Sequence, residues 1–307
     1  MSRHSASGKI SPRVFEGAVN EVRIDISQPF SLEQSAECGQ AFRWTRRNGQ
    51  YYCVAGRNIL RIRQRGSAIF ATLFPYTDGP GTLKVLGEMF RFSDDVNQIL
   101  AEISSDRYIS EAVRRHYGLR LIRQDPWECL ISYLCSINSN IPRIKGDVER
   151  LSSHYGDEII FDGNVFHTFP GVDVLADADE LELRKLKLGF RSKYIVAAAR
   201  KVRDEKIQLT SYRRLSYEDA FERLLSFYGV GPKVADCVLL FSMDKLEAFP
   251  VDRWVKRGVE MLYFKGTNIS EQKVREWAAT HFGRFAGYAQ EYLFYGSRLK
   301  EIIAGEK

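Results

Sequence analysis

The spacing of apolar residues changes once along the chain, from every second residue to the three- or four-residue spacing of a helix. Residues 41–46 and 51–55 flank an Asn48-Gly49 pair, the dipeptide of a tight hairpin turn. After residue 83 the helical spacing continues almost to the C-terminus. The sequence therefore predicts an α+β fold, with a small antiparallel sheet that is wet on one face, followed by a mostly α-helical part.

Helical spacing predicts a succession of helices in the second part. Asp125 followed by Pro126 marks the start of one of them, because it joins a capping side chain to a proline in the first turn. The others are expected at residues 83–90, 95–103, 143–155, 192–206, 217–227, 234–242, 254–262, 270–281 and 284–304. A chain of 307 residues exceeds one minimal core, and we divide it into a tail (1–12), a β-rich domain (13–115) and a helical core of two lobes (116–307).

Composition excludes several classes of protein. No apolar run approaches the length that spans a bilayer, and the first residues lack the apolar core of a secretory signal. The five cysteines are odd in number and form no CxxC pair, which argues against disulfides and against a zinc or iron–sulfur site. We therefore expect an intracellular protein with no membrane role, no metal and no cofactor.

Basic residues concentrate in one stretch. The whole chain has a net charge of +6, but residues 184–214 alone hold eleven Lys or Arg against two acids, a net charge of +9. Such a stretch is typical of a solvated helix face or of a phosphate-binding surface, and charge alone does not separate the two.

Residues 224–241 read as a helix, a Gly229-Val230-Gly231 turn and a second helix. The two glycines permit a backbone that no side chain would allow, and the amide N–H groups at the start of the second helix can hold a phosphate. A plain turn between two helices has the same pattern.

Lys233 stands just after this turn, at the start of an apolar helix. Desolvation and the positive end of the helix dipole disfavour a protonated amine there, and a neutral amine is a nucleophile for imine chemistry. A lysine that extends its charged end to solvent is the alternative. Asp252 follows Phe249-Pro250-Val251 and is a helix N-cap candidate, whose carboxylate could also stabilise positive charge developing on a sugar.

Six stretches together resemble the helix-hairpin-helix DNA glycosylases, and within them the 8-oxoguanine DNA glycosylase/AP lyases that carry an N-terminal β domain. They are CGQAFRW (38–44), QDPWECLISYLCSINSNIPRI (124–144), LGFRSKY (188–194), GVGPKVADC (229–237), PVD (250–252) and FAGYAQEYLF (285–294). The resemblance implies a helix-hairpin-helix glycosylase core, and a monomer that acts with the chromosome on double-stranded DNA containing an oxidised purine.

By this resemblance Lys233 is the Schiff-base nucleophile, Asp252 is its partner carboxylate, and Gly229, Val230 and Gly231 grip the phosphate backbone. The reaction would be base excision followed by β-elimination at the abasic site. The target nucleotide must leave the stack to reach Lys233, so the resemblance also implies a base pocket. Its positions are Gly39, Cys237, Gln290 and Phe294.

Other matching positions would read the opposite strand. Asn138, Asn140 and Arg143 match the loop that contacts the opposite base, with Phe190 as a wedge beside Arg191. Four positions depart from residues common in the family, namely Ser139, Phe190, Trp254 and Ser297. Two alternatives stay open: a monofunctional glycosylase in which Asp252 activates water, and a helix-hairpin-helix module that only binds DNA.

Overall fold

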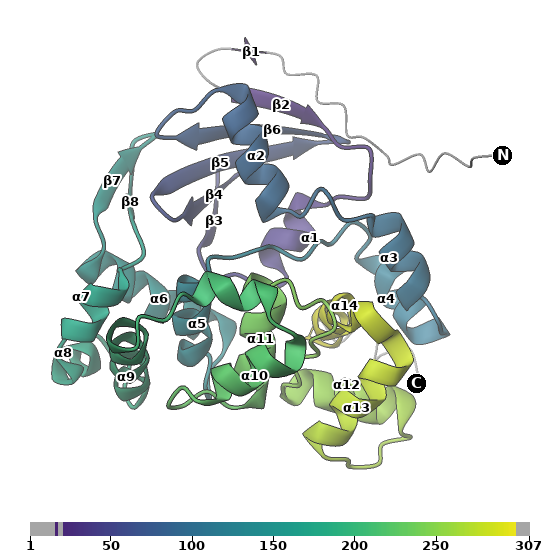
Figure 1. The fold of residues 1–307 in the computed structure, drawn as a ribbon. Helices are drawn as coiled ribbons and strands as arrows, with labels where there is room; N and C mark the ends of the chain where they lie inside the picture. The colour runs from purple at the N-terminus through teal and green to yellow at the C-terminus, as the bar shows by residue number, and fades with distance from the viewer. Residues whose placement is uncertain (1–15, 18–20, 299–307) are drawn as a thin grey trace.

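The first part of the chain forms an antiparallel sheet in the order β1-β2-β6-β5-β4-β3 (Figure 1). The computed structural model describes residues 16–17 and 21–298, so the predicted tail at 1–12 lies outside the described residues. The strands are β1 (Glu16–Gly17), β2 (Glu21–Asp25), β3 (Trp44–Arg47), β4 (Gln50–Ala55), β5 (Asn58–Arg65) and β6 (Ala68–Phe74). The predicted hairpin is confirmed as β3–β4, with positive φ at both Asn48 and Gly49.

The prediction of one wet face is wrong for the middle of the sheet. On one side, α2 (Gly79–Met89) packs its buried residues Leu86 and Met89 on the sheet. On the other side, a second hairpin of β7 (Glu158–Phe161) and β8 (Asn164–His167) packs Phe161 and Phe166 against Tyr52 and its neighbours. The sequence prediction failed because this cover comes from a segment about 100 residues further along the chain.

The second part is helical, as predicted. Its elements are α5 (Pro126–Cys135), α6 (Ile141–Tyr155), α7 (Val172–Asp177), α8 (Glu180–Lys185), α9 (Arg191–Asp204), η1 (Leu209–Arg214), α10 (Tyr217–Leu225), α11 (Pro232–Ser242), α12 (Arg253–Tyr263), α13 (Glu271–Phe282), η2 (Gly283–Phe285) and α14 (Ala286–Arg298). Before it come α1 (Leu32–Glu37), α3 (Val96–Ile103) and α4 (Arg107–Arg115). The helix expected at 284–304 begins instead as the 3-10 turn η2, and residues 299–304 lie outside the described part.

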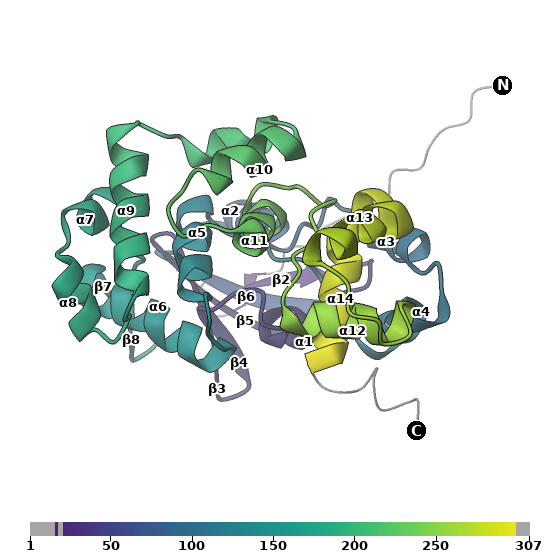
Figure 2. The ribbon, with the colours of Figure 1, turned by 90° about the horizontal axis from the view of Figure 1, so that it is seen from below.

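The helices form two groups on either side of α11 (Figures 1 and 2). One group holds α5 to α10, and the other holds α12 to α14 together with α3 and α4, which contact α14. In α11 every residue from Val234 to Ser242 is buried, and all of these residues except Asp236 and Ser242 are apolar. This helix therefore lies in the core between the two groups.

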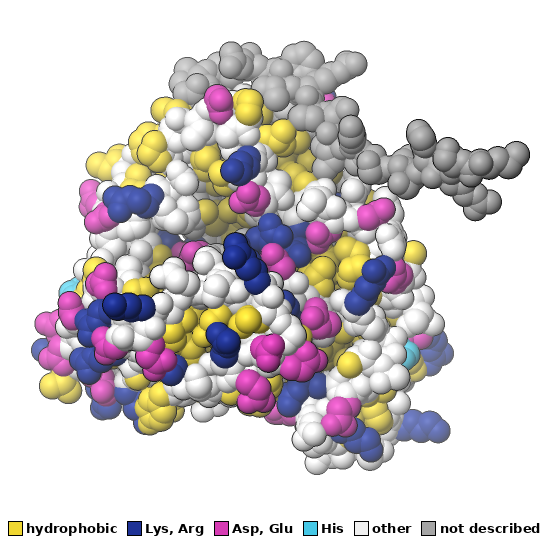
Figure 3. All heavy atoms as spheres, in the orientation of Figure 1, with side chains coloured by type: hydrophobic (Ala, Val, Ile, Leu, Met, Phe, Trp, Pro, Cys, Tyr) yellow, Lys and Arg dark blue, Asp and Glu magenta, His cyan; other side chains and the backbone are white. Residues whose placement is uncertain are grey.

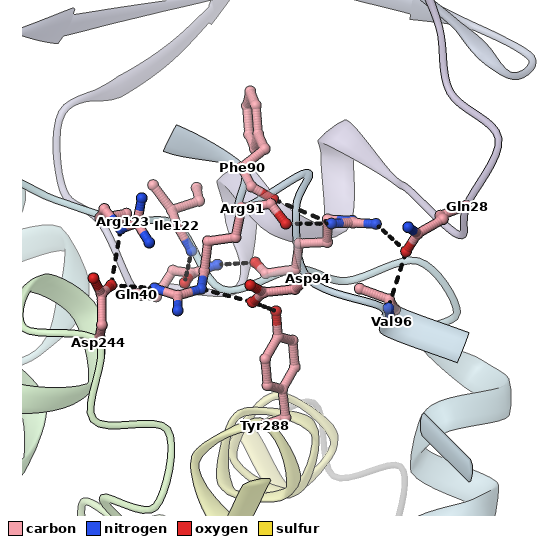
Figure 4. A network of polar contacts seen from close by, with 11 residues as sticks. Gln28, Gln40, Phe90, Arg91, Asp94, Val96, Ile122, Arg123, Asp244 and Tyr288 are labelled. Atoms are coloured by element: carbon pink, nitrogen blue, oxygen red, sulfur yellow. Dashed lines mark hydrogen bonds and ion pairs between the residues drawn. The ribbon is translucent and has the colours of Figure 1, made fainter. Parts of the chain in front are cut away.

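A buried ionic network joins the sheet half to the helical half (Figure 4). Arg91, which follows α2, pairs with Asp94 at 2.8 Å and with Asp244 at 2.6 Å. Arg123 also reaches Asp244, and the Tyr288 hydroxyl on α14 donates to Asp94. Two guanidinium groups thus face two carboxylates, which offsets the cost of burying them. The network fixes α14 and the loop after α11 relative to the sheet half.

No helix in the described part of the chain is long and apolar enough to cross a membrane. Among the same residues, no cluster of His, Cys, Asp or Glu side chains could hold a metal ion.

Candidate active site

Lys233 lies in the first turn of α11 and points toward the end of α5. Its Nζ donates to the Ser136 Oγ at 2.9 Å and lies 5.1 Å from the centre of the Tyr133 ring. The side chain is half-buried, so the amine is both held and accessible. One turn further along α11, on the same face, the Cys237 thiol is buried, and burial raises its pKa to about 12.

Asp252 is the N-cap of α12, as the sequence predicted. Its Oδ1 accepts from the Trp254 amide at 2.9 Å and from the Val255 amide at 2.8 Å. Burial raises the pKa of Asp252, while the Val255 amide and the charge of Lys233 lower it. The structure therefore brings together two groups 19 residues apart, each at the N-terminus of a helix.

The turn between α10 and α11 uses its two glycines differently. Gly229 has φ +89°, and a Cβ there would lie 2.5 Å from the Tyr194 ring, so both backbone and space require glycine. Gly231 has φ −98° with nothing near its missing Cβ, so the prediction that both glycines were needed for the turn is wrong. Gly231 caps α11 without a side chain, which leaves its first amides open, and the Val230 side chain is buried.

The Gly39 peptide is held rigidly just after α1. Gly39 has φ +106°, and a Cβ there would collide with Ile141. The next residue, Gln40, donates to the Arg120 carbonyl at 2.8 Å and accepts from the Ile122 amide at 2.8 Å. The Gln40 carbonyl in turn accepts from the Tyr133 hydroxyl, beside Lys233. These bonds fix the backbone at Gly39 relative to α5.

The two remaining pocket positions lie on α14. Gln290 is 4 % exposed, and its Oε1 finds no hydrogen-bond partner within the described residues. Phe294 is half-buried one turn later, with the Arg298 guanidinium 5.9 Å from its ring centre.

The residues that match the family's contacts to the opposite strand lie on one exposed edge. Asn138, Asn140 and Arg143 are exposed, and Asn140 caps α6 by accepting from the Arg143 amide at 3.0 Å. Phe190 is 41 % exposed and contacts Tyr194, which in turn lies against Gly229. The wedge position and the hairpin are therefore neighbours.

Arg191 differs from the rest of this set. Only 3 % of its surface is exposed, and its guanidinium donates to the Ile137 and Asn138 carbonyls. Arg191 belongs to the +9 stretch, but these two carbonyls occupy its guanidinium, which positions the loop that holds Asn138.

The +9 stretch is not one basic face. Several of its cations pair with acids or donate to carbonyls: Arg184 with Glu180, Lys201 with Glu205, Arg203 with Asp177 and Asp204, and Arg213 with the Ser242 carbonyl. Figure 3 shows acidic side chains among the basic ones over α7 to α9. Lys193 differs, because its Nζ lies over the Tyr194 and Tyr228 rings beside the hairpin.

Sequence reasoning missed Ser136, Tyr133 and Glu291. The first two contact Lys233 from about 100 residues away, and no local pattern marks them. Glu291 could have been found from the sequence, since it is a lone acidic residue inside the apolar run of α14. Two of the positions that depart from residues common in the family lie in the C-terminal helices. Trp254 is 41 % exposed beside Asp252, whereas Ser297 is buried against Gly258 of α12.

The chain joins a β-sheet half to a helical half and places a Lys and an Asp at the N-termini of two helices, as expected of a helix-hairpin-helix DNA glycosylase. Residues 22–130 match the family described as 8-oxoguanine DNA glycosylase, N-terminal domain, and residues 131–282 match the HhH-GPD superfamily base excision DNA repair protein. The chain belongs to the 8-oxoguanine DNA glycosylase family of this superfamily. The predicted fold class, and the enzyme class of N-glycosylase and DNA lyase, are confirmed.

Relatives match almost the whole chain. A probable N-glycosylase/DNA lyase of Methanothermobacter thermautotrophicus is 31% identical over 95% of this chain and 90% of its own. N-glycosylase/DNA lyase OGG1 of Arabidopsis thaliana is 34% identical, over 83% and 74%. A solved structure of Clostridium acetobutylicum 8-oxoguanine glycosylase/lyase, in complex with dsDNA containing cytosine opposite to 8-oxoG, matches with a TM-score of 0.86 and 33% identity, covering 93% of this chain and 97% of that one.

Proposed function

We propose that this chain is a bifunctional DNA glycosylase/AP lyase that excises 8-oxoguanine from duplex DNA through an imine on Lys233. The observation that carries this proposal is the proximity of Lys233 and Asp252, which lie close enough for the Lys233 charge to lower the pKa of Asp252. The amine is half-buried and is held at 2.9 Å by the Ser136 hydroxyl, and the carboxyl accepts from two backbone amides.

The chemistry follows from these two groups. After losing its proton, the Lys233 amine attacks C1′ of the sugar, the glycosidic C–N bond breaks, and the base departs with the bonding electrons. Asp252 stabilises the positive charge that develops on the sugar. Opening of the sugar ring gives the imine, which acidifies the C2′ proton. Loss of that proton forms a C=C bond and breaks the C3′–O bond, so the strand is nicked on the 3′ side.

Base recognition is assigned to the pocket positions. The Gly39 carbonyl would accept from the N7–H that oxidation creates, and Gln290 would meet the Watson–Crick edge of the flipped base. Phe294 and Cys237 would pack on the two faces of the ring. The unpartnered Gln290 Oε1 supports this assignment, because a buried acceptor without a partner is costly unless a ligand completes it.

The DNA surface is assigned to the hairpin and its neighbours. Open amides at the start of α11 and the ammonium of Lys193 suit phosphates, and exposed Phe190 suits the space left by the flipped nucleotide. Asn138, Asn140 and Arg143 would contact the opposite base. A monomer that acts with the chromosome, with domains divided after residue 115, remains part of the proposal.

Borohydride reduction during reaction with a duplex containing 8-oxoguanine opposite cytosine tests this proposal. A bifunctional enzyme gives a protein–DNA adduct, free 8-oxoguanine and a strand nicked on the 3′ side. Base release without adduct or nick would establish the monofunctional alternative. Binding without either product would establish a DNA-binding module.

A further inference from the structure

We propose that Glu291 is a second hydrogen-bond acceptor of the base pocket, which accepts from the 2-amino group of the flipped base. It would make the enzyme prefer lesions of guanine over lesions that lack this group. The inference rests on the proposed function and adds a specificity residue to it.

The Glu291 side chain is buried with one oxygen unused. Glu291 is 2 % exposed, and its Oε1 has no hydrogen-bond partner among the described residues. Burial raises the pKa of Glu291 to about 7, against the opposing influence of the Cys38 thiol and the Arg298 charge. An unused carboxyl oxygen in the interior costs free energy, and a base that donates a hydrogen bond to it would remove that cost.

Glu291 lies near several of the elements assigned to the base pocket. The Glu291 carboxyl is close enough to the Cys38 thiol, directly before Gly39, to raise the pKa of that thiol. Its charge also acts on three other groups that surround Lys233, on three different helices: Tyr133 of α5, Cys237 of α11 and the Asp252 cap of α12. Glu291 therefore stands among the elements assigned to the base pocket.

The Watson–Crick edge of 8-oxoguanine carries one acceptor, O6, and two donor groups, N1–H and the 2-amino group. The Gln290 amide can donate to O6 and accept from N1–H. An acceptor on a second side chain that reaches the 2-amino group would leave every group of this edge paired. Within the described residues, the Oε1 atoms of Gln290 and Glu291 are both buried and unpartnered on successive residues of α14, which offers these two acceptors.

Asp236 provides a matched control. It is also a fully buried carboxyl, and burial raises its pKa to about 7. It lies on α11 and is directed toward α10, where its Oδ1 accepts from the Tyr217 hydroxyl at 2.6 Å. Its Oδ2, like the Glu291 Oε1, has no hydrogen-bond partner among the described residues. Asp236→Asn therefore removes a buried charge of the same kind without touching the proposed acceptor.

The experiment compares two duplexes that differ only in the 2-amino group, with 8-oxoguanine or 8-oxohypoxanthine as the target base. Single-turnover excision is measured near pH 8, above the pKa of Glu291, for the wild type, Glu291→Gln, Glu291→Ala and Asp236→Asn. Nicking of a pre-formed abasic site is measured in parallel. The ratio of the two excision rates cancels any change in the chemistry common to both bases.

We expect Glu291→Ala to lower the preference for 8-oxoguanine about tenfold, the effect of one hydrogen bond to a charged acceptor. Glu291→Gln keeps an acceptor oxygen and should lose less, while Asp236→Asn should keep the full preference. Abasic nicking should change little in all three. An unchanged preference in Glu291→Ala, or an equal loss of excision and nicking, would overturn the inference. A wild type that excises neither base would overturn the proposed function and this inference with it.

Discussion

The two sides of the candidate site differ in how their polar groups are satisfied. On the reaction side, Lys233 and Asp252 already have partners in the protein, in the Ser136 hydroxyl and the α12 amides. On the recognition side, Gln290 and Glu291 each keep a buried oxygen without a partner in the part of the chain that the structure describes. The difference indicates that the reacting groups are positioned before DNA binds, whereas the pocket is completed only by the base. Variants on the two sides should therefore fail differently.

The largest effect short of removing the nucleophile is expected at Asp252. Asp252→Asn keeps an oxygen that can accept from the Trp254 and Val255 amides, so the melting temperature should stay close to that of the wild type. Loss of the negative charge should raise the activation free energy of base release by about 2–4 kcal/mol, which slows base release roughly 30- to 1000-fold. Single-turnover rates and a thermal melt measure both. A large drop in stability with unchanged chemistry would make Asp252 a structural cap only.

A smaller and selective effect is expected at Gln290. Gln290→Ala removes base-edge hydrogen bonds of about 1–3 kcal/mol, so excision of 8-oxoguanine should fall roughly 5- to 150-fold. Cleavage of a pre-formed abasic site needs no base and should largely survive. If both activities fell together, Gln290 would belong to the packing of α14, and the contrast between the two sides would be lost.

The smallest effect is expected on the surface around the hairpin. The slope of the logarithm of the binding constant against the logarithm of salt concentration reports the number of ions released when DNA binds. Lys193→Ala should lower that number by about one, because the Lys193 ammonium lies beside the hairpin. Arg184→Ala should leave the slope unchanged, because Arg184 is paired with Glu180. Binding titrations at several salt concentrations separate the two. Equal slopes for both variants would remove Lys193 from the DNA surface.

Local sequence signals explain which parts of the fold could be predicted. The β3–β4 hairpin was marked by Asn48-Gly49, and Asp252 was marked as a cap by the apolar approach before it. The β7–β8 hairpin was missed although Asp162-Gly163 is a turn dipeptide of the same kind, because its strands have only four residues each. The packing of this hairpin on the sheet could not be predicted from the sequence of the hairpin or of the sheet strands alone.

Contacts between distant segments explain the rest. Lys233 was predicted from its turn and helix, but its partner Ser136 is 97 residues away and carries no local mark. Arg191 was counted among the cations of the +9 stretch, and only tertiary packing shows its guanidinium occupied by two carbonyls. Charge counting along the chain cannot distinguish a free cation from one already paired in space.

Trapping with Lys233→Gln tests the central claim most directly. With borohydride and a duplex containing 8-oxoguanine, the variant should form no covalent adduct and no nick, yet it should still bind the duplex, because the pocket and the hairpin remain. Lys256→Gln is the matched control, since Lys256 pairs with Glu260 on α12, and it should trap like the wild type. A folded Lys233→Gln protein that still forms the adduct would contradict the account, because another amine would then be the nucleophile.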